Sequence, residues 1–255
     1  MIEITVVGAG LAGLTAALRL TERGYPVRVH ERYPGAGGLA RTVTIGGEPL
    51  EVFYHHIFTS DTAYVRLAQE LGLDREIEWL PSRMGIWTGG RLWDFGTPGS
   101  LLRFRPLGLL DKVRFVTSTL RLQRATDAAP FEDVPASQWI RRHQGERVWE
   151  SIWGPLFHQK FDRYADQVAM VWLWRKLYLR GRSRTRSGMG ERLGYMRGSF
   201  DRLTSALVDR VRGQGGTLHT GDPVQRIERD GDGFTVHTRS GRHRADLVLV
   251  AAPVP

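Results

Sequence analysis

The feature that most constrains this chain is the turn at residues 8–13, Gly-Ala-Gly-Leu-Ala-Gly, which joins an apolar run to a helical pattern. Residues 2–7 are short, apolar and rich in β-branched side chains, as a buried parallel strand requires. After the turn, leucine and alanine recur at helical spacing as far as Gly24, and a second strand-like run ends on Glu31. This order predicts a β–α–β unit with an acid 18 residues beyond its last turn glycine.

Such a turn, with its strand, helix and acid in register, is typical of a dinucleotide site. The first glycine permits the tight turn, the second lets the backbone approach a pyrophosphate, and the third lets helix and strand pack closely. The start of the helix offers unpaired N–H groups to phosphates, and the acid accepts hydrogen bonds from a ribose. The same acid would repel the 2′-phosphate of NADP. The residues predicted to bind are therefore Gly8, Gly10, Leu11, Ala12, Gly13 and Glu31.

Length and composition narrow the class of protein. A chain of 255 residues holds one large domain or two smaller ones, and no apolar run is long enough to cross a bilayer. Without cysteine there is no disulfide and no thiolate metal site, so we predict no metal and a cytoplasmic protein. The net charge of +9 comes almost entirely from arginine. Because these residues are spread along the chain without a nucleic-acid motif, no nucleic-acid partner is predicted.

A second glycine-rich run follows Glu31, at residues 34–38, and leads into Arg41 and Thr42. It cannot open an ordinary crossover helix, because it contains a proline and three glycines. It should return main-chain N–H groups and Arg41 towards the phosphates. Together, the first turn, the Glu31–Arg32 pair and residues 37–42 resemble the flavoprotein superfamily of amine oxidases, protoporphyrinogen oxidases, phytoene desaturases and UDP-galactopyranose mutases.

The resemblance implies FAD rather than NAD, since the second glycine motif lies along the FAD diphosphate in that superfamily. It also implies that a residue matching Val224 contacts the adenine through its backbone, and that a phosphate-side turn follows the last strand. The further cofactor-binding residues are thus Arg32, Gly37, Gly38, Leu39, Ala40, Arg41, Val224 and Ala251.

The implied fold is a Rossmann-like, glutathione-reductase-type α/β fold with a central parallel sheet, a β-meander and an inserted, mainly helical substrate domain. We place the FAD-binding domain at residues 1–78 and 191–255, and the inserted domain at 79–190. Relatives continue past the last strand into more substrate domain and a final strand and helix. The chain is therefore interpreted as an N-terminal portion without its C-terminal part.

Local patterns predict the remaining elements. Paired glycines at 46–47 and 89–90 predict hairpins over 42–53 and 84–95. Tryptophans over 127–180 are expected in the core of several short helices. The other predicted elements are helices at 61–72 and 200–213, a loop over 181–198, and strands at 217–220, 224–229, 233–238 and 245–253, the last of them buried.

His55 and His56 are the candidate catalytic residues, because they follow a strand and precede a helix, a usual place for site residues. In the flavoprotein superfamily that the chain resembles, the corresponding segment passes near the flavin. Residues 56–59 are similar to a histidine-bearing segment of UDP-galactopyranose mutases. The alternative is a pair of half-buried, hydrogen-bonded histidines. Adjacent histidines on a strand would point to opposite faces, which again implies no metal.

Residues 101–124 alternate between hydrophobic and basic side chains. One interpretation is an amphipathic helix of a helical domain. The other is a peripheral membrane patch, at the inner membrane face, through which an apolar substrate enters. A homodimer is a further expectation.

The function implied by the resemblance is that of an FAD-dependent oxidoreductase, in which a small-molecule substrate transfers hydride to flavin N5. Two alternatives stay open. One is a flavin-dependent nucleotide-sugar mutase, and the other is a flavin-free interaction module.

Overall fold

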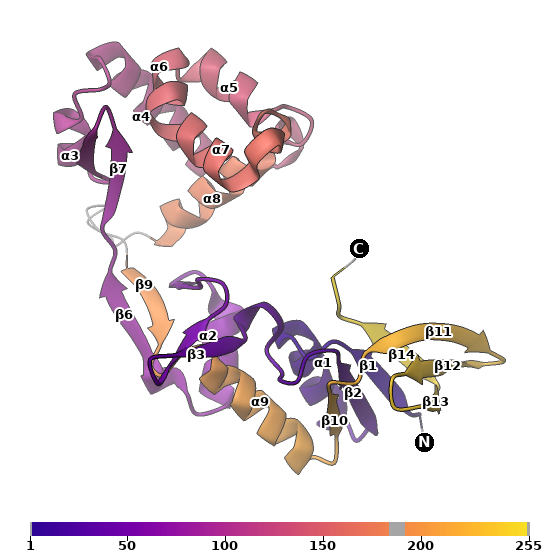
Figure 1. Ribbon diagram of the computed structural model, residues 1–255. Helices are drawn as coiled ribbons and strands as arrows, with labels where there is room; N and C mark the ends of the chain where they lie inside the picture. The colour runs from indigo at the N-terminus through magenta and orange to yellow at the C-terminus, as the bar shows by residue number, and fades with distance from the viewer. Residues whose placement is uncertain (1, 184–191, 254–255) are drawn as a thin grey trace. The chain divides into compact units, whose positions relative to one another are not determined.

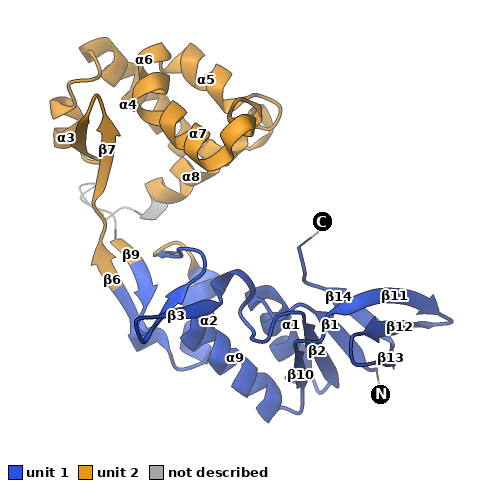
Figure 2. Cartoon of the chain, in the orientation of Figure 1, with its two compact units in different colours: residues 1–57, 62–78, 194–255 blue, residues 58–61, 79–193 orange. Residues whose placement is uncertain are grey.

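The computed structural model describes residues 2–183 and 192–253, and the chain divides into two compact units (Figure 2). Unit 1 comprises residues 1–57, 62–78 and 194–255, and unit 2 comprises residues 58–61 and 79–193. The chain therefore passes from one unit to the other near residues 78 and 193. That unit 1 is a cofactor domain and unit 2 a substrate domain stays a prediction.

Unit 1 is built on a parallel sheet with the order β10 (Thr217–Thr220), β2 (Val27–Glu31), β1 (Ile4–Val7) and β14 (Leu247–Val250) (Figure 1). Each neighbouring pair of strands is parallel. The C-terminal ends of the strands therefore meet at one edge of the sheet, and the first glycine turn leaves β1 at this edge.

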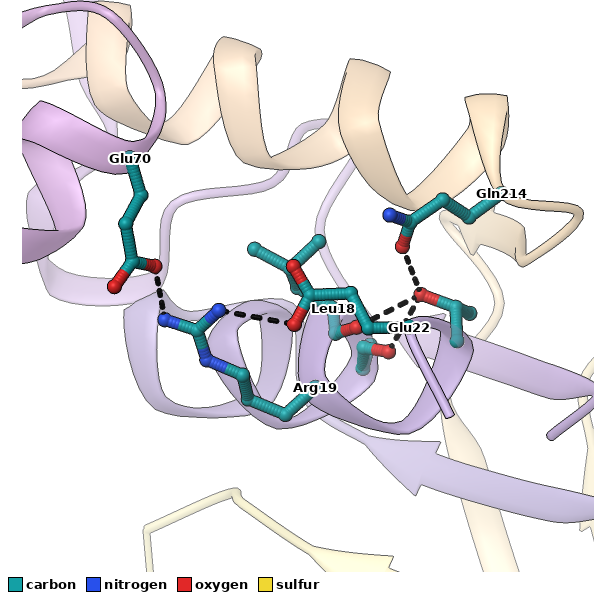
Figure 3. Close-up of polar contacts among 7 residues, drawn as sticks. Leu18, Arg19, Glu22, Glu70 and Gln214 are labelled. Atoms are coloured by element: carbon teal, nitrogen blue, oxygen red, sulfur yellow. Dashed lines mark hydrogen bonds and ion pairs between the residues drawn. The ribbon is translucent and has the colours of Figure 1, made fainter. Parts of the chain in front are cut away.

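Helices α1 (Leu11–Thr21) and α9 (Asp201–Gly213) pack against each other, and α2 (Thr62–Glu70) lies close to α1. Figure 3 shows the polar contacts at the end of α1, where Arg19 forms ion pairs with Glu22 and with Glu70 of α2. The Thr21 hydroxyl lies 2.8 Å from the amide oxygen of Gln214, just beyond α9. These contacts tie three helices of unit 1 together.

Antiparallel elements complete unit 1. The predicted meander is present as β11 (Val224–Asp230) and β12 (Gly233–Thr238), and it continues into β13 (Arg242–Ala245), which the sequence did not indicate. The predicted hairpin is also present, as β3 (Thr42–Ile45) and β4 (Glu48–Glu51). Both turn glycines have positive φ, which a primed turn requires.

Three short strands, β5 (Ile57–Phe58), β9 (Arg192–Met196) and β6 (Ile77–Pro81), form a sheet in that order. The loop predicted over 181–198 is therefore wrong at its two ends, because helix α8 extends to Ser183 and β9 begins at Arg192. Residues 184–191 of that prediction lie outside the described residues.

Unit 2 contains the second predicted hairpin, β7 (Met84–Thr88) and β8 (Arg91–Phe95), followed by helices. The helices are α3 (Pro98–Arg103), α4 (Leu109–Arg124), α5 (Ala136–His143), α6 (Glu146–Val148), α7 (Gly154–Phe161) and α8 (Met170–Ser183). Trp139, Trp149, Trp153 and Trp174 are buried in one hydrophobic core, and Trp172 packs against it. The tryptophans are core residues, as predicted. Among the described residues, no helix combines the length and the apolar character needed to span a bilayer.

The predicted burial of the last strand is wrong. Leu247, Leu249 and Val250 of β14 are 52%, 40% and 62% exposed. Among the described strands, β14 lies at the edge of the four-stranded sheet and pairs with β1, and its side chains on both faces of the sheet are left largely uncovered. Its apolar sequence resembles that of a central strand, and burial depends on what lies beside it.

Candidate functional site

The first glycine turn has the geometry that the sequence predicts. Gly8 has a φ of +102°, a conformation that favours glycine. A Cβ on Gly13 would lie 2.0 Å from the carbonyl oxygen of Gly8, so only glycine allows helix α1 to pack this closely against the turn. Gly10 is the N-cap of α1, and no side chain within the described residues caps this helix. The first N–H groups of α1 are therefore available for an anion.

The second glycine run lies directly against the first turn. Gly10 and Gly37 form a parallel bridge, and the Gly37 N–H donates to the Ala9 carbonyl over 2.8 Å. Gly38 has a φ of +59°, and a Cβ on it would lie 2.9 Å from the Cα of Gly10. The two motifs, separated in sequence, thus form one glycine-lined surface.

The open side of this surface is at Gly10. A Cβ added to Gly10 would meet only one atom within 4 Å, the Cα of Gly38 at 3.7 Å. Main chain without side chains, beside the start of a helix, is what a diphosphate needs in order to approach N–H groups. The residues present therefore fit the diphosphate of a dinucleotide cofactor.

Glu31, at the end of β2, is held by the same turn. It is 6% exposed, and its carboxylate accepts a hydrogen bond from the Ala9 N–H at 2.8 Å and one from the Tyr33 N–H at 3.0 Å. A carboxylate has about four acceptor positions, so capacity remains for ribose hydroxyl groups. The predicted acid is thus part of the turn itself as well as a candidate ribose ligand.

Two predicted arginines surround one aromatic ring. The guanidinium carbons of Arg32 and Arg41 lie 4.9 Å and 4.3 Å from the centre of the Tyr33 ring. The Arg41 guanidinium also donates to the Gly38 carbonyl at 3.3 Å. Arg41 is therefore positioned beside the second glycine run, next to the surface that would hold phosphates.

The last two predicted residues lie at neighbouring loop ends. The Ala251 N–H donates to the Val7 carbonyl over 2.8 Å, and a Cβ on Gly8 would meet the Ala251 carbonyl oxygen at 3.2 Å. Val224 is half-buried at the first position of β11. The turn before it is tied to β2, because the Asp222 N–H donates to the Glu31 carbonyl at 3.0 Å.

A stack of three histidines lies beside this turn, and sequence reasoning missed it. His30 is 5% exposed, and its ring stacks between those of His219 and His243, with centroids 4.8 Å and 4.9 Å away. Its Nδ1 lies 3.0 Å from a carboxylate oxygen of Asp222. Burial lowers the pKa of His30, although the hydrogen bond to Asp222 opposes this effect.

Asp222 is the anchor of the same network. Burial opposes its ionisation, but hydrogen bonds from the main chain and hydroxyl of Ser240, from Thr238 and from His30 lower the pKa of this carboxyl to about 2. The carboxylate is therefore charged at neutral pH and fixes the turn that precedes Val224. Alternating hydrophobicity along a strand gives no signal for such a network, because its members come from segments far apart in the sequence.

His55 and His56 lie in a different environment from the glycine residues. Both are half-buried, and they precede β5 in irregular backbone, so the argument from opposite strand faces does not apply to them. The His55 ring lies 5.5 Å from that of Phe200, and its Nδ1 lies 2.5 Å from the Phe53 carbonyl oxygen. Within the described residues, no group of three or more histidine and acidic side chains is placed to hold a metal ion.

Glu51 is a second buried carboxylate in this region that the sequence analysis did not single out. It accepts hydrogen bonds from the Tyr195 hydroxyl at 2.8 Å and from the Phe200 N–H at 2.8 Å. Burial and this bond raise the pKa of Tyr195 to about 12. Burial and the charge of Glu51 raise the pKa of nearby Tyr64 above its ordinary value, so both phenols stay protonated.

Comparison with known proteins gives a consistent result. A protein of Mycobacterium tuberculosis that bears the name flavin-containing monoamine oxidase AofH is 27% identical over 99% of this chain and 57% of its own length. The 15-cis-phytoene desaturase of Narcissus pseudonarcissus is 25% identical over 99% of this chain and 48% of its own length. The chain thus spans about half the length of the curated relatives that it matches.

Solved structures show the same fold. A putrescine oxidase variant matches with a TM-score of 0.74 and 18% identity, covering 99% of this chain and 58% of that one. Cyclohexylamine oxidase from Brevibacterium oxydans IH-35A matches with a TM-score of 0.67 and 20% identity, covering 98% of this chain and 57% of that one. The predicted α/β fold with its parallel sheet is therefore confirmed.

The family of flavin-containing amine oxidoreductases has a model that matches residues 11–255. The family description and the name of the bacterial relative both specify a flavin, which supports the predicted FAD. Because the match extends over nearly the whole chain, the chain belongs to the family of flavin-containing amine oxidoreductases.

Proposed function

We propose that unit 1 holds FAD along the C-terminal edge of its parallel sheet, with the diphosphate on the surface formed by the two glycine motifs. The observation that supports this most strongly is their close approach, with Gly37 hydrogen-bonded to Ala9 and Gly38 against Gly10. The proposed contacts are Gly8, Gly10, Leu11, Ala12, Gly13, Glu31, Arg32, Gly37, Gly38, Leu39, Ala40, Arg41, Val224 and Ala251.

The proposed reaction removes a hydride from an activated C–H or N–H bond of a small-molecule substrate. When bound, FAD supplies the hydride acceptor at N5, and oxygen or another acceptor reoxidises it. The contribution of the chain is to bind and orient, and to place partial positive charge at the diphosphate. His55 and His56 stay candidates for the substrate side, and unit 2 is proposed as part of the substrate domain.

A titration of FAD into the purified chain, followed by flavin fluorescence and absorbance, tests the proposal. The informative variant is Gly10→Ala, because the new Cβ meets the protein only at ordinary contact distance but projects into the space proposed for the diphosphate. Losing one hydrogen bond to a charged phosphate, at about 1.5–3 kcal/mol, should weaken binding about 10- to 150-fold.

Gly35→Ala is the matched control, since a Cβ at that position meets nothing within 4 Å. Its affinity for FAD should equal that of the unchanged chain. Thermal unfolding without FAD separates affinity from stability, because alanine at the N-cap costs about 1 kcal/mol by itself. Equal affinities for the Gly10 and Gly35 variants would refute the proposed binding surface.

Two other outcomes correspond to the alternatives. Binding of a uridine diphosphate sugar to the reduced protein would favour the nucleotide-sugar mutase over the oxidoreductase. A chain that folds, stays monodisperse and takes up no flavin at saturating concentration would favour the interaction module.

The substrate is proposed to be apolar, and the chain to be cytoplasmic with a peripheral contact to the inner membrane face through residues 101–124. A substrate of this kind dissolves in the bilayer, so an enzyme that meets the bilayer surface gains access to it. The exposed apolar side chains of α4 support this part of the proposal. A homodimer stays a prediction.

A further inference from the structure

Helix α4 has apolar side chains on the side that faces away from the hydrophobic core of unit 2. Leu109, Val113, Val116 and Leu120 are spaced at i, i+4, i+7 and i+11, and they therefore share one face of the helix. Their exposure ranges from 38% to 76%. This row is a continuous aliphatic stripe in contact with solvent.

The stripe is not the face by which α4 is anchored. Ser118 and Leu122 are the buried residues of the helix, and Phe115 packs against the core of unit 2. These side chains lie on the opposite side by helical periodicity. An ordinary amphipathic helix of a helical domain has its apolar side inward and its polar side outward, whereas α4 is apolar on both sides.

The stripe continues into neighbouring residues. The Lys112 ammonium donates to the Leu102 carbonyl over 2.8 Å, which holds the end of α3 beside the start of α4. Leu102 is 70% exposed, and Leu110 is 62% exposed. We call Leu102, Leu109, Leu110, Val113, Val116 and Leu120 the leucine face.

Basic residues border the leucine face. Helix α4 contains Lys112, Arg114, Arg121 and Arg124 but only one acid, Asp111, whose carboxylate accepts from the Gly108 N–H. By periodicity Lys112 lies on one flank of the stripe, and Arg121 and Arg124 lie on the other. Long basic side chains beside aliphatic ones place their charge at the level of lipid phosphates when the aliphatic groups enter a bilayer.

We propose that the leucine face docks on a bilayer rich in anionic phospholipid, with its aliphatic side chains among the lipid headgroups and its basic side chains at the phosphates. The charge favours this occupant over a second copy of the chain, because two faces with the same positive charge repel each other. The inference deepens the proposed membrane contact and rests on it, but it does not depend on the flavin chemistry.

Flotation of the purified chain with lipid vesicles tests the inference. Vesicles of phosphatidylcholine with about 25% phosphatidylglycerol should bind the chain, and the binding should weaken in about 0.5 M salt and on pure phosphatidylcholine. The double variant Leu109→Glu/Val113→Glu should lose the binding. Both side chains are more than half exposed, so unit 2 should still fold. Leu156→Glu, on α7 of the same unit and 42% exposed, is the matched control and should bind like the unchanged chain.

The charged flank has its own test. Arg121→Gln/Arg124→Gln should bind the anionic vesicles about 25-fold more weakly, at about fivefold for each basic residue, and should lose most of the salt dependence. Its affinity for pure phosphatidylcholine should not change.

Three results would overturn the inference. The first is absence of flotation with anionic vesicles, and the second is equal flotation of the Leu109→Glu/Val113→Glu and Leu156→Glu variants. The third is a dimer of the unchanged chain in light scattering that the Leu109→Glu/Val113→Glu variant converts to a monomer, with no vesicle binding by either protein. The leucine face would then cover a second copy of the chain. An FAD titration of the same samples reports the cofactor proposal separately.

Discussion

Replacing Glu31 with glutamine should destabilise unit 1 through two main-chain hydrogen bonds. The carboxylate is 6% exposed and accepts from the N–H groups of Ala9 and Tyr33. Glutamine has one carbonyl oxygen, so it can replace only one of these acceptors, and its NH₂ group then faces a second N–H donor. A buried N–H left without an acceptor costs about 1–3 kcal/mol, and bonds to charged groups lie at the upper end. We therefore expect a loss of about 2–3 kcal/mol in the free energy of unfolding.

Urea unfolding followed by circular dichroism measures this loss as a shift of the midpoint at constant slope. Glu22→Gln is the control, since Glu22 is a partly exposed partner of Arg19 on the surface of α1. A surface ion pair of this kind contributes about 0–1 kcal/mol. The control should therefore unfold close to the unchanged chain, while Glu31→Gln unfolds at a clearly lower concentration of urea.

A Glu31→Gln variant within about 0.5 kcal/mol of the unchanged chain would refute this account of the turn. It would mean that the glycine turn holds its shape without the acid. Glu31 would then be a cofactor ligand only, and its replacement would change FAD affinity without changing stability.

Two further predictions concern the other buried polar groups. Tyr195→Phe should cost about 1–2 kcal/mol in urea unfolding, because one oxygen of buried Glu51 loses its donor, and Tyr25→Phe should cost much less. A loss of unfolding free energy in Tyr195→Phe that is no larger than the loss in Tyr25→Phe would contradict this prediction. Burial lowers the pKa of His30 and of His243, so the unfolded chain takes up protons below about pH 6.5 that the folded chain does not. The free energy of unfolding should therefore keep its full contribution from these histidines above that pH and should decrease as the pH is lowered. A urea midpoint near pH 5.5 that equals or exceeds the midpoint above about pH 6.5 would contradict this prediction.

The local elements were predictable from the sequence because each rests on neighbouring residues. The glycine spacing at 8–13 predicts a turn between β1 and α1, and the structure shows why Gly8 and Gly13 are needed there. The glycine pairs at 46–47 and 89–90 similarly mark two tight hairpins. In both cases the backbone conformation itself restricts the choice of residue, so the signal is present in the sequence.

Burial was predicted less well because it depends on distant parts of the chain. The apolar run of β14 has the composition of a central strand, yet β14 is an edge strand with exposed side chains. In α4, periodicity shows that apolar residues occur on both sides of the helix but does not show which side meets the core. Strand β9 follows a glycine- and arginine-rich segment and lies between β5 and β6 in its sheet. Both of these strands are distant from β9 in sequence, so no local pattern indicates that it is a strand.

The candidate cofactor site shows the same division between local and distant causes. Most of the polar and glycine residues expected to touch FAD are recognisable, since a ligand restricts those positions to glycine, acid or arginine at fixed spacing. The residues that hold them are not recognisable in this way. His30 and Asp222 are 192 residues apart in sequence, and nothing near either one indicates the contact between them. Yet Asp222 fixes the turn before Val224, and through its N–H it also bonds the carbonyl of Glu31. A search for binding motifs therefore identifies the side of this site that would face the ligand and overlooks the polar network that positions it.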